Sequence, residues 1–136
     1  MSQDTHTHDK DASAIAECTV NNVSRYWLTY DSSSQKLEHG EVTPDYGPQD
    51  VAPQESRTFS IQSDGWMTGC EGNFYWKVSG TESGIFHVHL KKPYIGNGNM
   101  WSGVFSGAEN VITAGPSSYE TSGDDNFSIE VTVMDL

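Results

Sequence analysis

Apolar and polar residues alternate along most of this 136-residue chain, as they do in strands with one buried and one solvated face. The alternation is cleanest near the end of the chain, where Phe127, Ile129, Val131 and Val133 share one face. Helical spacing is almost absent. The pattern predicts strands over residues 14–22, 25–31, 35–43, 55–62, 73–79, 84–92, 110–114 and 126–135.

Turn and loop signals separate these strands. Residues 44–53 contain three prolines, and residues 93–107 form a long loop rich in glycine and asparagine, with a short strand near Phe105. Residues 115–125 are expected to form another polar loop. Short strands at this spacing predict an all-β fold, a single-domain antiparallel β-sandwich over residues 14–136. The polar residues 1–13 are expected to form a disordered N-terminal tail.

The alternation also separates aromatic side chains that pack in the core from those that lie outside it. The expected core aromatics share strand faces with aliphatic residues: Phe59, Phe74, Trp76, Phe86 and Phe127. Other large side chains fall in loops or on opposite strand faces, and they are the candidates for membrane or partner contact: Trp27, Trp66, Met67, Tyr75, Tyr94 and Trp101. Tryptophan and tyrosine favour the bilayer interface. The simpler role for any one of these side chains is to close an open end of the sandwich. Because a small polar chain carries six of them, we favour contact with a membrane or a partner protein.

The net charge of the chain argues against two kinds of binding partner. Nineteen acidic residues against seven basic ones give a net charge of −12 and an isoelectric point near 4.5. This balance argues against nucleic acid and against a polybasic anchor on anionic lipid. Membrane contact would therefore involve neutral or zwitterionic head groups. Residues 1–14 lack the apolar core of a signal peptide, so we expect synthesis in the cytoplasm and release by lysis or another Sec-independent route.

Motifs for catalysis or metal binding are missing from the sequence. Nothing matches a nucleophile elbow, a P-loop or an HExxH helix, so we expect neither enzymatic activity nor a cofactor. His87 and His89 project from one strand face, but two ligands do not make a metal site, and we expect both to be solvated. Cys18 and Cys70 are expected to be buried free thiols, and a bridge between them is possible only if their strands are neighbours.

A family resemblance is carried by the segment SDGWMTGCEGNFYW, residues 63–76. Its order, S-[DN]-G-aromatic-M-T-G-x-E-G-x-x-Y-aromatic, resembles the aegerolysin family, and most closely the small components of bacterial binary insecticidal toxins. The resemblance extends over residues 17–134 through TVNNVS, KKPYIGNGNMWSG and NVITAG, and the middle motif alone is specific. The tryptophan positions differ from those of the fungal members, so fungal lipid specificity is not carried over.

The resemblance implies an acidic β-sandwich that recognises lipids in target-cell membranes from outside the cell. It further implies pore formation together with a larger protein partner, and self-assembly on the membrane is a related expectation. Two alternatives stay open from the residues. Exposed Trp and Tyr side chains also stack on sugar rings, which would make the chain a carbohydrate-binding β-sandwich module. The second alternative is that the chain is a non-toxic aegerolysin with a developmental or stress role.

Overall fold

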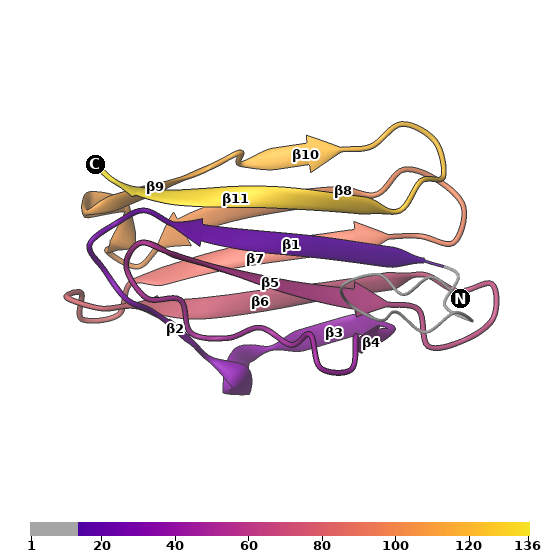
Figure 1. Cartoon of the computed structure of the whole chain (residues 1–136), viewed down its shortest axis with the longest axis horizontal. Coiled ribbons are helices and arrows are strands. Elements are labelled where there is room, and N and C mark those ends of the chain that lie inside the picture. The colour runs from indigo at the N-terminus through magenta and orange to yellow at the C-terminus, as the bar shows by residue number, and fades with distance from the viewer. Residues whose placement is uncertain (1–13) are drawn as a thin grey trace.

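Two β-sheets pack face to face in the computed structural model, which describes residues 14–136 (Figure 1). The predicted β-sandwich is confirmed, and the tail predicted over residues 1–13 lies outside the described residues. Within residues 14–136 the only helical segments are two short 3-10 turns, η1 (Ser32–Ser34) and η2 (Ala108–Asn110).

The first sheet has five strands. Their order across the sheet is β4 (Glu41–Val42), β5 (Glu55–Gln62), β1 (Ile15–Asn22), β11 (Phe127–Asp135) and β9 (Ile112–Gly115). The pairing of β1 with β11 is parallel, so the expectation of a wholly antiparallel sandwich is wrong for this one pair. Parallel neighbours need a long connection between them, and nearly the whole domain lies between these two strands.

The second sheet has six strands and carries most of the features considered below. Their order is β10 (Ser118–Glu120), β8 (Asn99–Phe105), β7 (Ile85–Lys92), β6 (Cys70–Val78) and β2 (Leu28–Tyr30), and β3 (Lys36–His39) also pairs with β6. All of its pairings are antiparallel.

Several sequence-based boundaries are wrong, including those of the strand predicted over residues 25–31, which is only β2, and of the strand predicted over 110–114, which begins at Ile112. The loop predicted over residues 93–107 contains the whole of β8, and the polar loop over 115–125 contains β10. Glycine and asparagine are poor strand formers, but β8 pairs with β7 over its full length, and this tertiary pairing outweighs the local preference. Strand β6 also begins at Cys70, three residues before the predicted start.

The single strand predicted over residues 35–43 is two short strands in different sheets. Strand β3 pairs with β6 and strand β4 with β5. Gly40 joins them with φ +82°, and a Cβ atom there would lie 2.4 Å from the carbonyl oxygen of Gln62. Only glycine fits at this point, where the chain crosses from one sheet to the other.

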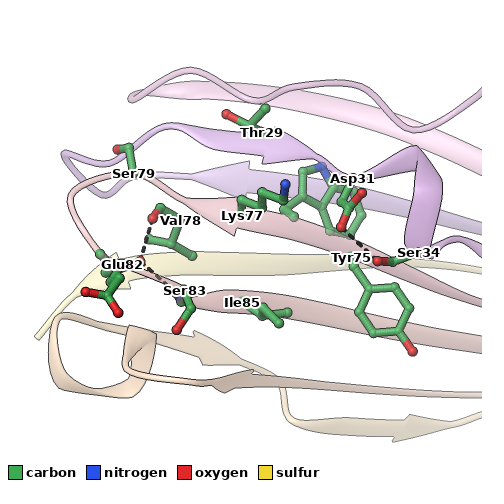
Figure 2. Close-up of a pocket in the computed structure, with 13 residues that line it drawn as sticks. Thr29, Asp31, Ser34, Tyr75, Lys77, Val78, Ser79, Glu82, Ser83 and Ile85 are labelled. Atoms are coloured by element: carbon green, nitrogen blue, oxygen red, sulfur yellow. Dashed lines mark hydrogen bonds between the residues drawn. The ribbon is translucent and has the colours of Figure 1, made fainter.

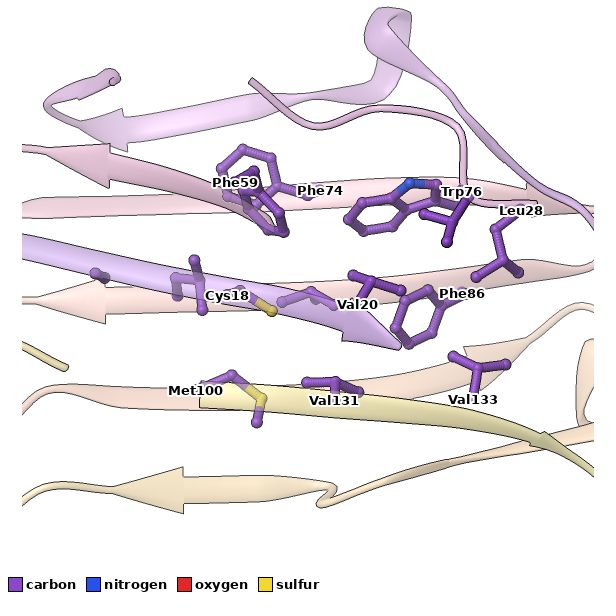
Figure 3. Close-up of a cluster of buried hydrophobic side chains, with 14 of the residues drawn as sticks. Cys18, Val20, Leu28, Phe59, Phe74, Trp76, Phe86, Met100, Val131 and Val133 are labelled. Carbon is purple, nitrogen blue, oxygen red and sulfur yellow. The ribbon is translucent and has the colours of Figure 1, made fainter. Parts of the chain in front are cut away.

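The core fills the space between the sheets (Figure 3). All five expected core aromatics are buried, which confirms that part of the sequence analysis. Phe59 from the first sheet packs on Phe74 and Trp76 from the second, with ring centroids 4.8 and 5.7 Å apart. The indole Nε1 of Trp76 donates to the carbonyl of Gln49 at 2.9 Å, so its burial leaves no polar atom unpaired. Cys18 and Cys70 are free and buried, as predicted.

Candidate functional site

The six side chains proposed for contact lie in three separate places. Trp66, Met67 and Tyr94 lie in the loops at the end of the sandwich where β6 begins and β7 ends. Tyr75 and Trp101 lie on the outer face of the six-stranded sheet. Trp27 precedes β2 at the opposite end, because Leu28 pairs with Val78 at the far end of β6.

The first place, here called the loop end, consists of residues 63–69 and 93–98 (Figure 1). It presents large apolar side chains to solvent: Trp66 is 84% exposed, Ile95 70% and Met67 46%. The two loops touch at Gly69, where a Cβ atom would lie 2.7 Å from the carbonyl oxygen of Lys92. Glycine therefore permits the close approach that brings the two apolar loops to one end.

Hydrogen bonds fix the backbone of the loop end. The Thr68 hydroxyl donates to the Gly65 carbonyl at 2.8 Å, and Met67 adopts a left-handed backbone with φ 59° between them. The second loop is tied to residues 121–126, since the Gly96 N–H donates to Asp124 at 2.6 Å and the Gly98 N–H to Thr121 at 2.8 Å. The exposed side chains thus stand on a constrained frame.

Ile95 is a member of the loop end that the sequence reasoning missed. The sequence does contain a sign of its exposure. Ile95 lies between Tyr94 and Gly96 in a predicted loop, where no strand face is available to bury an aliphatic side chain. The loop end also carries acidic residues, Asp64 beside Trp66 and the pair Asp124 and Asp125 in the adjoining loop. An apolar tip bordered by carboxylates suits an uncharged or zwitterionic surface better than an anionic one.

The second place is an aromatic layer on the outer face of the six-stranded sheet. Tyr75 stacks on His87 with centroids 4.3 Å apart and an interplanar angle of 16°. Trp101 meets His87 edge-on at 4.5 Å and stacks on His89 at 6.0 Å. Phe105 folds over Gly103, whose missing side chain leaves room for the ring.

This layer corrects two sequence-based expectations. Trp101 is in strand β8 rather than in a loop, where it pairs directly with His89. His87 and His89 are not solvated, because the neighbouring rings cover them and leave His87 only 8% exposed. Burial and, to a smaller extent, the nearby His89 together lower the pKa of His87 to about 4.

Both histidines have hydrogen-bonding partners on β6. The Nε2 atom of His87 lies 2.9 Å from Asn73 Oδ1, and that of His89 lies 2.9 Å from a carboxylate oxygen of Glu71. No group of three histidine, cysteine or acidic side chains converges as metal ligands would within residues 14–136. Nor does this part of the chain contain a helix with the length and apolar character needed to cross a bilayer.

A groove of about 810 Å³ adjoins the aromatic layer and is here called the sheet-face groove (Figure 2). Strands β2, β6 and β7 form its floor, and the Ser79–Gly84 turn and the residues after β2 form its walls. The residues that matter most for its chemistry are Thr29, Asp31, Tyr75, Lys77, Glu82 and Ile85. Sequence reasoning identified Tyr75 alone among them, because the groove arises from turns that no local pattern places together.

Comparison with known proteins shows a likeness in structure. No protein-family model matches the chain, and no curated protein matches its sequence. Among solved structures, the chain is similar to the lipid-binding protein Nakanori, with a TM-score of 0.65 over 90% of this chain and 69% of that one, at 10% sequence identity. At this identity the likeness shows that the two chains share a β-sandwich fold.

Proposed function

We propose that this protein binds the lipid surface of target-cell membranes through its loop end. The observation that carries the proposal is the exposure of Trp66, Met67 and Ile95 on one constrained end of the sandwich. Exposed apolar groups that gather in this way mark interaction surfaces, whereas single ones need no explanation. Nakanori, which has the same fold, is described as lipid-binding, and this supports the proposal.

The charge of the chain defines the kind of membrane. Net charge −12 and the acids at the loop end repel anionic lipid, so binding depends on apolar insertion among zwitterionic head groups. Trp66 has the side chain best suited to that layer, since its ring is apolar and its N–H can hydrogen-bond to the head groups.

A sedimentation assay with lipid vesicles tests this proposal. We expect binding to vesicles of equimolar phosphatidylcholine and phosphatidylethanolamine, and weaker binding when phosphatidylserine is added. Replacing Trp66→Ser and Ile95→Ser together should lower the partition coefficient at least tenfold, because burying one such side chain contributes about 1.5–3 kcal/mol.

Trp27→Ser is the matched control. Trp27 is 50% exposed but lies at the opposite end of the sandwich, so its loss should leave vesicle binding unchanged. Equal losses in the two variants would show that binding does not depend on the loop end. Wild-type protein that fails to sediment with any of these vesicles would contradict the proposal itself.

We further propose that membrane binding serves a two-component insecticidal toxin, in which this chain is the small component and acts outside the producing cell with a larger pore-forming partner. The motif at residues 63–76 and its resemblance to the small components of such toxins support this role. The protein alone should bind vesicles without releasing an entrapped dye. Complete dye release by this chain alone would contradict the need for a partner.

A further inference from the structure

The sheet-face groove has a mixed polar lining over an apolar floor. Hydroxyl groups come from Thr29, Ser34 and Ser83, a cation from Lys77 and carboxylates from Asp31 and Glu82. Because the groove carries one positive and two negative side chains, it has no excess of positive charge with which to bind a phosphate or sulfate group. The lining instead combines hydrogen-bond acceptors on Asp31 and Glu82 with donors on Thr29 and Lys77, as a neutral polyol requires.

Asp31 is held in place as an acceptor. Its two carboxylate oxygens accept hydrogen bonds from Ser33 at 2.6 Å and Ser34 at 2.7 Å, and its N–H donates to the carbonyl of Tyr75 at 2.8 Å. The hydrogen bonds from Ser33 and Ser34 lower the pKa of Asp31, which keeps the carboxylate ionised near neutral pH. Each carboxylate oxygen of Asp31 keeps a lone pair that can accept a further hydrogen bond from a hydroxyl group of a ligand.

Tyr75 supplies an aromatic wall to the same groove. One face of its ring stacks on His87 of β7, and the ring as a whole is only half-buried, so this histidine leaves the opposite face uncovered. Tyr75 lines the groove together with Ile85 and Lys77 (Figure 2). A half-buried ring that is fixed on its back face is a rigid platform, and it loses little conformational entropy when a ligand stacks on it.

We propose that the sheet-face groove binds a neutral carbohydrate unit of a surface glycan. The C–H face of a sugar ring stacks on Tyr75, while its hydroxyls bond to Asp31, Lys77 and Thr29. The groove volume of about 810 Å³ falls in the range of small-molecule sites. This site does not depend on the proposed lipid binding, because it lies on the face of the sheet rather than at the loop end.

Binding of the intact protein to an array of neutral hexose and N-acetylhexosamine oligosaccharides tests the inference, since such an array contains no lipid. We expect at least one glycan to bind. Tyr75→Ala should weaken that binding at least tenfold, whereas Tyr75→Phe keeps the ring and most of the affinity. Lys77→Met changes an exposed side chain without disturbing the core, and it should also weaken binding.

Trp27→Ser lies outside the groove and should bind glycans as the wild type does. The inference is overturned if no glycan binds above background, or if Tyr75→Ala and Lys77→Met both bind as the wild type does. Competition by free phosphocholine but not by free sugar would also overturn it, since it would show a lipid head group in the groove. Failure here leaves the vesicle assay unaffected, because those vesicles contain no sugar.

Discussion

At the scale of single residues, His87 has the most unusual environment. It is a titratable ring enclosed by Tyr75, Trp101 and Phe105, and burial lowers its pKa from the ordinary 6.5 to about 4. Between these two pH values an unfolded chain binds a proton that the folded chain excludes. Folding stability therefore falls as pH decreases from 6.5 toward 4, and His87 has no such effect above pH 6.5.

This dependence can be measured by thermal unfolding at pH 7.5 and pH 4.5. His87→Gln cannot take up the proton, so its loss of stability between the two pH values should be smaller than that of the wild type, by on the order of 2 kcal/mol. His39→Gln alters an exposed histidine and is expected to keep the wild-type dependence. The same pH dependence in His87→Gln and wild type would show that the ring takes up its proton in the folded state.

The sequence was a good guide to residues whose position depends on local alternation. It placed Phe74 and Trp76 in the core, Tyr75 on the opposite face and Trp66 in an exposed loop, all as observed. It failed for His87, because the cover over that ring comes from Trp101 on β8. No local pattern near His87 can reveal that a glycine-rich segment further along the chain forms the adjacent strand.

At the scale of elements, the motif over residues 63–76 acts chiefly through its glycines. Gly69 lets the two loops of the loop end meet, and Gly72 pairs with Leu37 of the neighbouring strand β3. A Cβ atom on Gly72 would lie 2.6 Å from Leu37 Cδ2 and 2.9 Å from Phe74 Cζ. The motif is therefore a packing requirement of β6 as well as the feature that carries the family resemblance.

Gly72→Ala should destabilise the fold by roughly 1–3 kcal/mol, because the added methyl group must displace Leu37 and Phe74 in a packed site. Urea unfolding followed by tryptophan fluorescence would show this as a lower midpoint. Gly47→Ala is the control, since a Cβ there would meet its nearest neighbour at an ordinary 3.7 Å. Equal midpoints for the two variants would mean that the contact at Gly72 relaxes without cost.

At the scale of the whole molecule, electrostatic repulsion and the apolar loop end act against each other. Net charge −12 keeps copies apart near neutral pH, and this repulsion fades as the pH approaches 4.5. Light scattering from pH 8 to 4.5 should therefore show growing self-association, and far-UV circular dichroism would separate it from unfolding. Replacing Trp66 and Ile95 by serine should reduce the association. A constant particle size over this range would contradict the expectation.

The parallel pairing of β1 with β11 has a consequence for how the protein is made. Glu17 and Ser128 are adjacent in this pairing, yet they are 111 residues apart in the chain. At ordinary rates of translation, roughly 5 to 20 seconds pass between the synthesis of the two strands. During that time β1 can pair with β5 on one side only, and its other edge stays open to wrong partners. A chain released before β11 is made would thus contain every strand of the six-stranded sheet, while in the other sheet β1 would pair with β5 alone and keep one edge unpaired.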